Sequence, residues 1–478
     1  MRRSSFAAMA MLLVVGLSAV TQVAAAAPAT AAATPREWDA RLLPIVEQVQ
    51  KLRGLTFEHP VKVEYLADAA FEKRVAIDDE KLSKADKRGA ERSEAQLRAL
   101  GLVPPGTDLL ASTSDLQQSG VLAYYSPVTK QVTVRGKKLD VPIRVTLAHE
   151  LTHALQDQHF DLTEIQRAAR KDHGSAAATA LIEGDATRVQ REYVDGLSGA
   201  EREEYSQWER DTGTQVDGEL DADAVPGVLI AIFQSPYVLG PEMLRAVVAA
   251  KGDGAVDDLF RDPPADDLSY LDPLSIVGDH AGAKVTPPTL DAGDEQDGKR
   301  DVFGAFALYL LLATSGDPVH ALDVARGWGD DAMVTFTRSG TTCLRATFTG
   351  TNGETSSAIH DALADWATNR SGGAASVTAA SDDTTLTACD RGGATTDPGT
   401  TPQAALVTAA IRSTLLAQAL EVFGERTASC VVDRALSDPT FRPLLDASVA
   451  TPYAAPDESV SDAFTRRITA IATSCADA

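Results

Sequence analysis

The chain has 478 residues and a formal net charge of −24 at pH 7, with 44 Lys and Arg residues against 68 Asp and Glu residues. A surface with this excess of negative charge repels nucleic acids and anionic lipids, so we expect neither as a partner. Hydrophobic residues make up 44% of the sequence, which is enough for a sizeable buried core.

Residues 1–27 have the pattern of an export signal. Two arginines precede an apolar run from Phe6 to about Val20, and small residues follow at 23–27. This run is too short for a comfortable membrane span, and no second long apolar stretch follows it. We therefore expect a signal peptide at 1–27, no stable membrane insertion, and a secreted, extracellular protein.

The next part of the chain predicts helices followed by a hairpin. Apolar residues recur at helical spacing over 38–53, and polar and apolar residues alternate as in a strand over 61–66. The charged stretch 67–100 predicts one or two solvated helices. Two short runs, 120–125 and 131–134, flank a Ser-Pro pair and predict a β-hairpin.

The most informative motif follows this hairpin, in a helix that Pro142 is expected to open. His149 and His153 are four residues apart, so on a helix both imidazoles lie on one face and can reach one small cation. Glu150 lies at the neighbouring edge, where it can contact a water molecule instead of the cation. This H-E-x-x-H pattern is typical of zinc hydrolases.

A catalytic zinc ion normally has a third protein ligand, for which two residues compete. His159 matches the spacing of a longer histidine pattern, but that pattern needs a glycine where this chain has Gln156. If the helix continues, His159 also points away from the shared face. Glu183 lies in a second helical stretch between apolar and small residues, so we favour His149, His153 and Glu183 as the zinc ligands.

These motifs carry a family resemblance. The run 147–162, followed by Glu183-Gly184-Asp185-Ala186, resembles the secreted gluzincin-type zinc metallopeptidases of prokaryotes, and weaker likeness extends over 36–390. The resemblance implies an α+β, zincin-like domain with a helix-rich core and a small sheet. It also implies that one strand of the predicted hairpin binds extended substrate, without saying which one. Residues 263–267 and 329–332 depart from the polar pattern expected of that group.

The expected chemistry assigns further roles. Zinc would activate water and polarise the scissile carbonyl, with Glu150 as the catalytic base. Tyr237 and His280 are candidate donors to the developing oxyanion. Asp157 and Asp185 are candidate partners that orient a liganding imidazole, or else solvent-facing acids near helix ends.

The rest of the chain predicts mainly helices and then a small sheet. In order, we expect a charged helix over 186–215, an apolar helix over 226–250 broken at Pro236, a long loop over 252–300, a helix over 303–313, strands near 334–336 and 344–348, a helix over 357–367 and a strand over 384–388.

The C-terminal third contains all four cysteines. Their order suggests the pairs Cys343–Cys389 and Cys430–Cys475, although four cysteines allow three connectivities. Residues 391–403 have the composition of a linker. We expect residues 404–478 to form a small all-α, disulfide-containing domain.

The sequence thus predicts an exported zinc metallopeptidase that acts on a peptide or protein substrate, with Zn²⁺ as cofactor. The competing hypothesis is a secreted binding or surface-associated protein that holds zinc without turnover. The sequence leaves the oligomeric state open.

Overall fold

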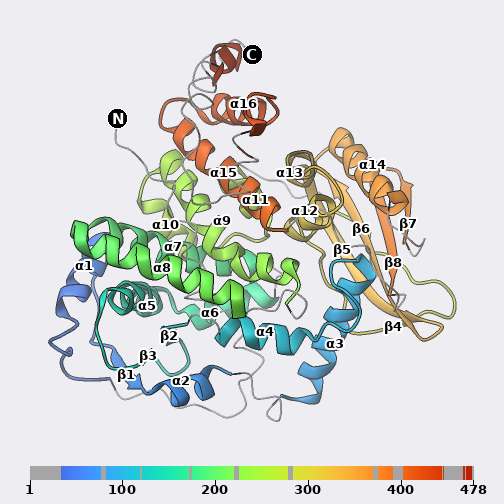
Figure 1. Cartoon of the computed structure of the whole chain (residues 1–478). Coiled ribbons are helices and arrows are strands. Elements are labelled where there is room, and N and C mark those ends of the chain that lie inside the picture. The colour runs from blue at the N-terminus through green and yellow to red at the C-terminus, as the bar shows by residue number, and fades with distance from the viewer. Residues whose placement is uncertain are drawn as a thin grey trace.

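The computed structural model describes residues 34–76, 82–118, 121–171, 175–219, 225–277, 284–369, 375–390, 402–443, 445, 467–468 and 470–475. The predicted signal peptide and most of the predicted linker lie outside these residues. The described chain combines many helices with two small sheets, so its fold class is α+β (Figure 1).

The first sheet has three strands in the order β1-β3-β2. Strands β2 (Ala123–Ser126) and β3 (Gln131–Arg135) pair antiparallel and confirm the predicted hairpin. Strand β1 (Lys62–Leu66) pairs parallel to β3, so β3 has a neighbour on both sides. Of the two hairpin strands, β2 is therefore the one at an edge of the sheet.

Helices precede and follow these strands along the chain. They are α1 (Leu43–Arg53), α2 (Asp68–Val75), α3 (Lys84–Leu100), α4 (Leu109–Gln118), α5 (Val141–Phe160), α6 (Leu162–Lys171), α7 (Ser175–Asp195) and α8 (Gly199–Glu219). The carboxylate of Asp140 caps α5 by accepting the Ile143 N–H at 3.3 Å, and Pro142 lies in the first turn. The predicted single helix over 186–215 is wrong, because α7 ends at Asp195 and α8 begins at Gly199.

Helix α9 (Gly227–Lys251) runs without the predicted break at Pro236. A proline inside a helix removes the N–H that would bond to the carbonyl four residues earlier. Here that carbonyl belongs to Ile232, and the Ser235 hydroxyl donates to it at 2.8 Å. The neighbouring serine thus satisfies the carbonyl that Pro236 leaves without its backbone donor.

The predicted long loop over 252–300 is partly wrong, because it contains α10 (Gly254–Arg261), α11 (Leu268–Leu271), a 3₁₀ turn (Pro273–Ile276) and β4 (Glu295–Gln296). These elements are short, and their apolar residues are spread among many aspartates. Val256, Leu259 and Phe260 are nevertheless buried. The short apolar spacing in α10 therefore marks a packed helix.

The second sheet has the strand order β4-β5-β6-β8-β7. Its longer elements and their neighbours are α12 (Ala305–Ala313), α13 (Pro318–Arg326), β5 (Trp328–Arg338), β6 (Thr341–Gly350), α14 (Gly353–Asn369), β7 (Ala375–Ala380) and β8 (Asp383–Cys389). The sequence predicted all of these except α13 and the edge strand β7. Strand β7 is rich in alanine and exposed, so it lacks the apolar alternation that reveals a half-buried strand.

The C-terminal helices α15 (Pro402–Leu420) and α16 (Glu425–Leu436) pack on the rest of the chain. Helix α15 lies along α9, and its apolar residues belong to the same core cluster as those of α9 and α12. Both suggested disulfides are present, Cys343–Cys389 and Cys430–Cys475. They are compatible with an exported protein.

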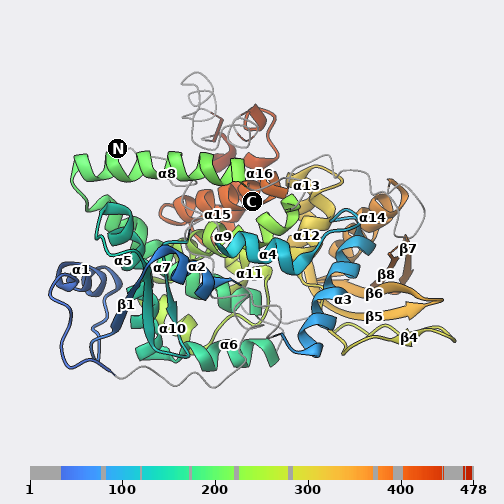
Figure 2. The same cartoon turned by 60° about the horizontal axis from the view of Figure 1, so that its bottom comes forward.

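The core has two main apolar clusters. One surrounds the first sheet with α1 and α5, and the other joins α9, α11, α12 and the second sheet. Helix α7 contributes to both, because Leu181 packs into the second cluster and Val189 into the first. Figure 2 shows α5 and α7 with the first sheet at one end of the molecule and the second sheet at the other. Among the described residues, α9 alone is long and apolar enough to cross a membrane, and 72% of its apolar window is buried.

Candidate metal centre

Helices α5 and α7 bring the three predicted ligands together. Oε2 of Glu183 lies 3.2 Å from Nε2 of His149 and 3.1 Å from Nε2 of His153. One ligand atom from each residue lies within 4.8 Å of the other two. All three side chains are buried, with residue exposures of 2% or less. Among the described residues, this is the one cluster of His, Cys, Asp or Glu found able to hold a metal ion.

The other ring nitrogens of the two histidines contact glutamines. Nδ1 of His149 lies 2.9 Å from Oε1 of Gln190, and Nδ1 of His153 lies 3.0 Å from Oε1 of Gln156. An amide oxygen accepts hydrogen bonds, so each Nδ1 carries the proton. Each Nε2 then faces Glu183, and in a neutral imidazole it is the nitrogen whose lone pair can bind a cation.

The two predicted orienting acids do not contact the imidazoles, and that expectation is corrected. The Asp157 carboxylate accepts from the Tyr125 hydroxyl, from Nζ of Lys130 at 2.8 Å and from the Leu162 N–H at 3.0 Å. Asp185 contacts Gln156 and not an imidazole, because its Oδ2 accepts from Nε2 of Gln156 at 2.9 Å. The residue one turn along α5 that does contact an imidazole is Gln156, through Nδ1 of His153.

Sequence reasoning used Gln156 only to argue against the longer histidine pattern, and it missed Gln190 altogether. The available signal was a glutamine three residues after His153 on a helix that is otherwise apolar around the motif. Such a polar group needs a partner once it is buried, and an adjacent imidazole is a suitable one. Gln190 follows Glu183 by seven residues, which is about two helical turns and therefore the same face of α7.

His159 lies outside the cluster. Helix α5 continues to Phe160, so the side chain of His159 is turned away from the face that holds His149 and His153. Its Nε2 lies 2.8 Å from the carbonyl oxygen of Thr56. The structure therefore brings Glu183, and not His159, to the two imidazoles.

Glu150 lies between the cluster and the edge strand β2. Its Oε2 accepts the backbone N–H of Tyr125 at 2.6 Å, while its Oε1 is buried without a hydrogen-bond partner. Burial raises the pKa of Glu150 to about 8, and the nearby Glu183 carboxylate acts in the same direction. The Tyr125 N–H fixes one carboxylate oxygen and leaves the other unpaired in the protein interior.

In the cluster, the negative charge of Glu183 and a positive charge on His153 stabilise each other. Burial opposes protonation of His153, but the Glu183 carboxylate outweighs it and raises the pKa of His153 to about 9. Burial also acts against ionised Glu183, yet contact with both imidazoles holds the pKa of that carboxyl well below its usual value. Burial and the neighbouring His153 lower the pKa of His149. Glu183 is thus an anion that draws positive charge to this point.

Of the two predicted oxyanion donors, one lies beside the cluster. Tyr237 on α9 has its ring centroid 6.4 Å from that of His149. Burial raises the pKa of its hydroxyl well above the usual value, and the carboxylates of Glu183 and Glu150 add to this rise. Tyr237 therefore keeps its proton and can donate a hydrogen bond. His280 lies outside the described residues.

The residues present fit a zinc ion. Two imidazole nitrogens and one carboxylate oxygen are the donors of a common catalytic zinc site. Oε1 of Glu183 and Oε1 of Glu150 are both buried without a hydrogen-bond partner, which is costly for polar oxygens unless a cation or water satisfies them. Comparison with protein-family models, curated proteins and solved structures finds no match for this chain.

Proposed function

We propose that this chain is an exported zinc metallopeptidase with a zincin-like, gluzincin-type catalytic domain. The observation that carries the proposal is the placement of three zinc-type ligand atoms within 4.8 Å of one another. A fourth side chain, Glu150, lies beside them with one unpaired carboxylate oxygen. The substrate class is a peptide or protein.

The residues around the site have clear roles in peptide hydrolysis. Zinc bound by such ligands supplies Lewis acidity, which polarises a carbonyl oxygen and makes water more acidic. The Glu150 carboxylate accepts a proton from the attacking water and passes it to the leaving amine. Burial raises the pKa of Glu150 to about 8, and a cation held by the three ligands would favour the ionised, proton-accepting form of this carboxyl group. The Tyr237 hydroxyl donates a hydrogen bond to the oxyanion.

Strand β2 is the best placed element to hold an extended substrate. The sequence left open which strand of the hairpin would bind substrate. Because β3 is paired on both sides, β2 is the hairpin strand that has an edge for a further strand. The backbone N–H of Tyr125 points from β2 to Glu150, so the unpaired edge of β2 faces the candidate catalytic base. A peptide added along this edge would pass close to Glu150.

A non-catalytic zinc protein is the second candidate. The observation that favours it is the burial of the whole cluster, with exposures of 0% for His149, 1% for Glu150 and 0% for Glu183. A closed zinc site stabilises a fold without turning over substrate. The two candidates differ in what Glu150 does.

The experiment compares wild type with Glu150→Gln and Glu183→Gln. Zinc content is measured by elemental analysis, and peptide hydrolysis is measured on a mixed protein substrate by the appearance of new amino termini. We expect Glu150→Gln to keep its zinc and lose at least about 100-fold in hydrolysis, as removal of a general base does. We expect Glu183→Gln to lose most of its zinc.

The control is Glu192→Gln, the same change on α7 at a side chain that is 44% exposed and paired with Arg188. It should match wild type in both measurements. Equal hydrolysis by wild type and Glu150→Gln would reject the peptidase. Retained zinc with no hydrolysis in the wild type would favour the non-catalytic zinc protein, and full zinc in Glu183→Gln would reject the ligand set.

A further inference from the structure

We propose that Arg53, the last residue of α1, is a positioning residue of the metal centre that holds the imidazole of His153 in place through Asp185 and Gln156. This inference rests on the proposed zinc function. It makes the N-terminal helix part of the metal centre, although Arg53 is 130 residues before Glu183 in the sequence.

The Arg53 guanidinium is fixed from several sides. Its Nε donates to Oδ2 of Asp185 at 2.6 Å, and its Nη2 donates to Oδ1 of Asp257 on α10 at 2.6 Å. Its carbon Cζ lies 6.0 Å from the ring centroid of Phe160 and 5.7 Å from that of Phe260. The side chain is only 4% exposed, so this arginine joins three helices in the interior.

Asp185 depends on this arginine. Its side chain is fully buried, and a buried carboxylate needs a cationic partner. Arg53 supplies a nearly buried partner to Oδ2, while the more exposed Arg188 contacts Oδ1 at 3.0 Å. The same Oδ2 accepts from Nε2 of Gln156. Arg53 therefore fixes the atom that orients Gln156.

The amide of Gln156 can have only one orientation in this setting. Its Nε2 faces two acceptors, Oδ2 of Asp185 at 2.9 Å and the carbonyl oxygen of Ile182 at 3.1 Å. A reversed amide would place its oxygen against both acceptors and present an N–H to His153. With the observed orientation, Oε1 accepts from Nδ1 of His153 and holds the ring with its Nε2 towards Glu183.

Loss of Arg53 would release the carboxylate of Asp185 and, through it, the amide of Gln156. An Asp185 carboxylate without this partner would turn towards Arg188, and Gln156 would lose one of the two acceptors that fix its amide. The imidazole of His153 would then lose the fixed partner at its Nδ1. Zinc binding would have to order that ring again, so the zinc affinity falls.

The test is a double-mutant cycle on zinc affinity. The variants are Arg53→Met, Gln156→Leu and the double variant, with the zinc dissociation constant measured by competition with a chromogenic chelator at pH 7. We expect each single variant to weaken zinc binding by about 10- to 100-fold, which is typical for residues that orient a metal ligand. The double variant should bind zinc no more weakly than Gln156→Leu, because Arg53 acts through Gln156.

The matched control is Arg261→Met. Arg261 also lies over the Phe160 ring, at 5.9 Å, but it pairs with the exposed Asp258. The zinc affinity of Arg261→Met should equal that of wild type. Arg53→Lys keeps the charge and should restore part of the affinity. If Arg53→Met fails to fold by circular dichroism, Arg53→Lys takes its place in the cycle.

Two results would overturn the positioning role while leaving the zinc proposal intact. One is unchanged zinc affinity in the Arg53 variant. The other is multiplication of the two losses in the double variant, which would mean that Arg53 acts independently of Gln156. Absence of zinc binding by the wild-type chain is a different outcome, since it rejects the proposed function itself and this inference with it.

Discussion

Two carboxylates, those of the half-buried Asp267 and the buried Asp331, hold the start of α12. Asp267 accepts the backbone N–H groups of Ala305 and Phe306, and Asp331 accepts those of Phe303 and Gly304. The first N–H groups of a helix have no partner within the helix, and the contacts at Gly304, Ala305 and Phe306 satisfy three of them. The sequence departs from the expected polar pattern at 263–267 and 329–332. Each of these stretches contributes a carboxylate that binds the start of α12.

The free energy of unfolding should depend on pH through Asp267. Burial and the facing Asp331 raise the pKa of Asp267 to about 7, against about 3.9 in an unfolded chain. Between these values the folded protein keeps a proton that the unfolded chain has lost, so stability falls as pH rises from 4 to 7. Urea unfolding at several pH values should show a smaller fall in Asp267→Asn than in wild type.

The quantity to compare is the slope with pH, because Asp267→Asn also loses a backbone contact and is less stable overall. The control is Asp258→Asn, the same change at a side chain that is 78% exposed. Its slope should follow that of wild type. Parallel curves for Asp267→Asn and wild type would contradict the assignment.

At this scale, sequence spacing predicted the ligands but not their supports. The i, i+4 histidines and the carboxylate on the next small-residue helix could be read from the chain, because helical geometry determines which side chains share a face. The contacts of Gln156, Gln190 and Arg53 depend on how α1, α5 and α7 pack together. Those partners lie up to 132 residues apart, and no local pattern specifies them.

At the scale of elements, a close helix crossing sets the position of Glu183. Gly184 on α7 meets Gly240 on α9, and a Cβ atom added at Gly184 would lie 2.5 Å from the Gly240 carbonyl carbon. Tyr237 is three residues before Gly240, about one turn away, and Glu183 is next to Gly184. The structure shows that the glycine serves the contact with α9.

Gly240→Ala should therefore destabilise the protein and disturb the site. The new Cβ would lie 2.4 Å from the Ala180 carbonyl oxygen, which is backbone and has little room to move. We expect a loss of about 1–3 kcal/mol in the free energy of urea unfolding, as for other overpacked positions. Zinc affinity should fall with it, because α7 and α9 are pushed apart beside Glu183.

Gly89→Ala is the matched control for this change. Gly89 lies within α3, and a Cβ atom there has no neighbour within 4 Å. Alanine is the better helix former, so this variant should gain about 0.5–1 kcal/mol. A Gly240→Ala variant that is as stable as Gly89→Ala would show that the crossing tolerates a methyl group.

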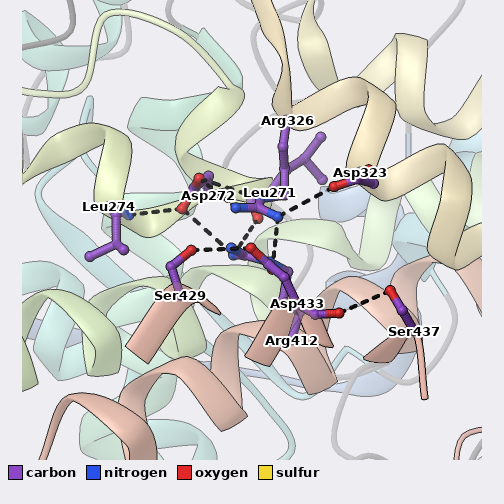
Figure 3. A network of polar contacts seen from close by, with 9 residues as sticks. All are labelled: Leu271, Asp272, Leu274, Asp323, Arg326, Arg412, Ser429, Asp433 and Ser437. Carbon is purple, nitrogen blue, oxygen red and sulfur yellow. Dashed lines mark hydrogen bonds and ion pairs between the residues drawn. The ribbon is translucent and has the colours of Figure 1, made fainter. Parts of the chain in front are cut away.

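At the scale of the whole molecule, ion pairs join the C-terminal helices to the centre of the fold (Figure 3). Arg412 on α15 is fully buried; its Nε donates to Asp433 on α16 at 3.1 Å, and its Nη1 donates to the Leu271 carbonyl at 3.2 Å. Arg326 on α13 contacts both Asp433 and Asp272. The sequence predicted helices after residue 404, but their attachment depends on these long-range contacts and on packing against α9.

Arg412→Met tests whether this attachment stabilises the whole chain. The change leaves Asp272 and Asp433 with Arg326 as their remaining partner in this network, so we expect a loss of about 1.5–3 kcal/mol, as for a hydrogen bond to a charged group. We expect a lower midpoint in thermal unfolding and faster proteolysis within α16.

Arg442→Met removes an exposed pair with Asp317 between the same two parts of the chain, so it should change stability by less than about 1 kcal/mol. Because α15 shares its core cluster with α9, the Arg412 variant should lower the stability of both parts together. A lower midpoint for the C-terminal helices alone, with the rest of the chain unfolding as in wild type, would mean that the two parts fold independently.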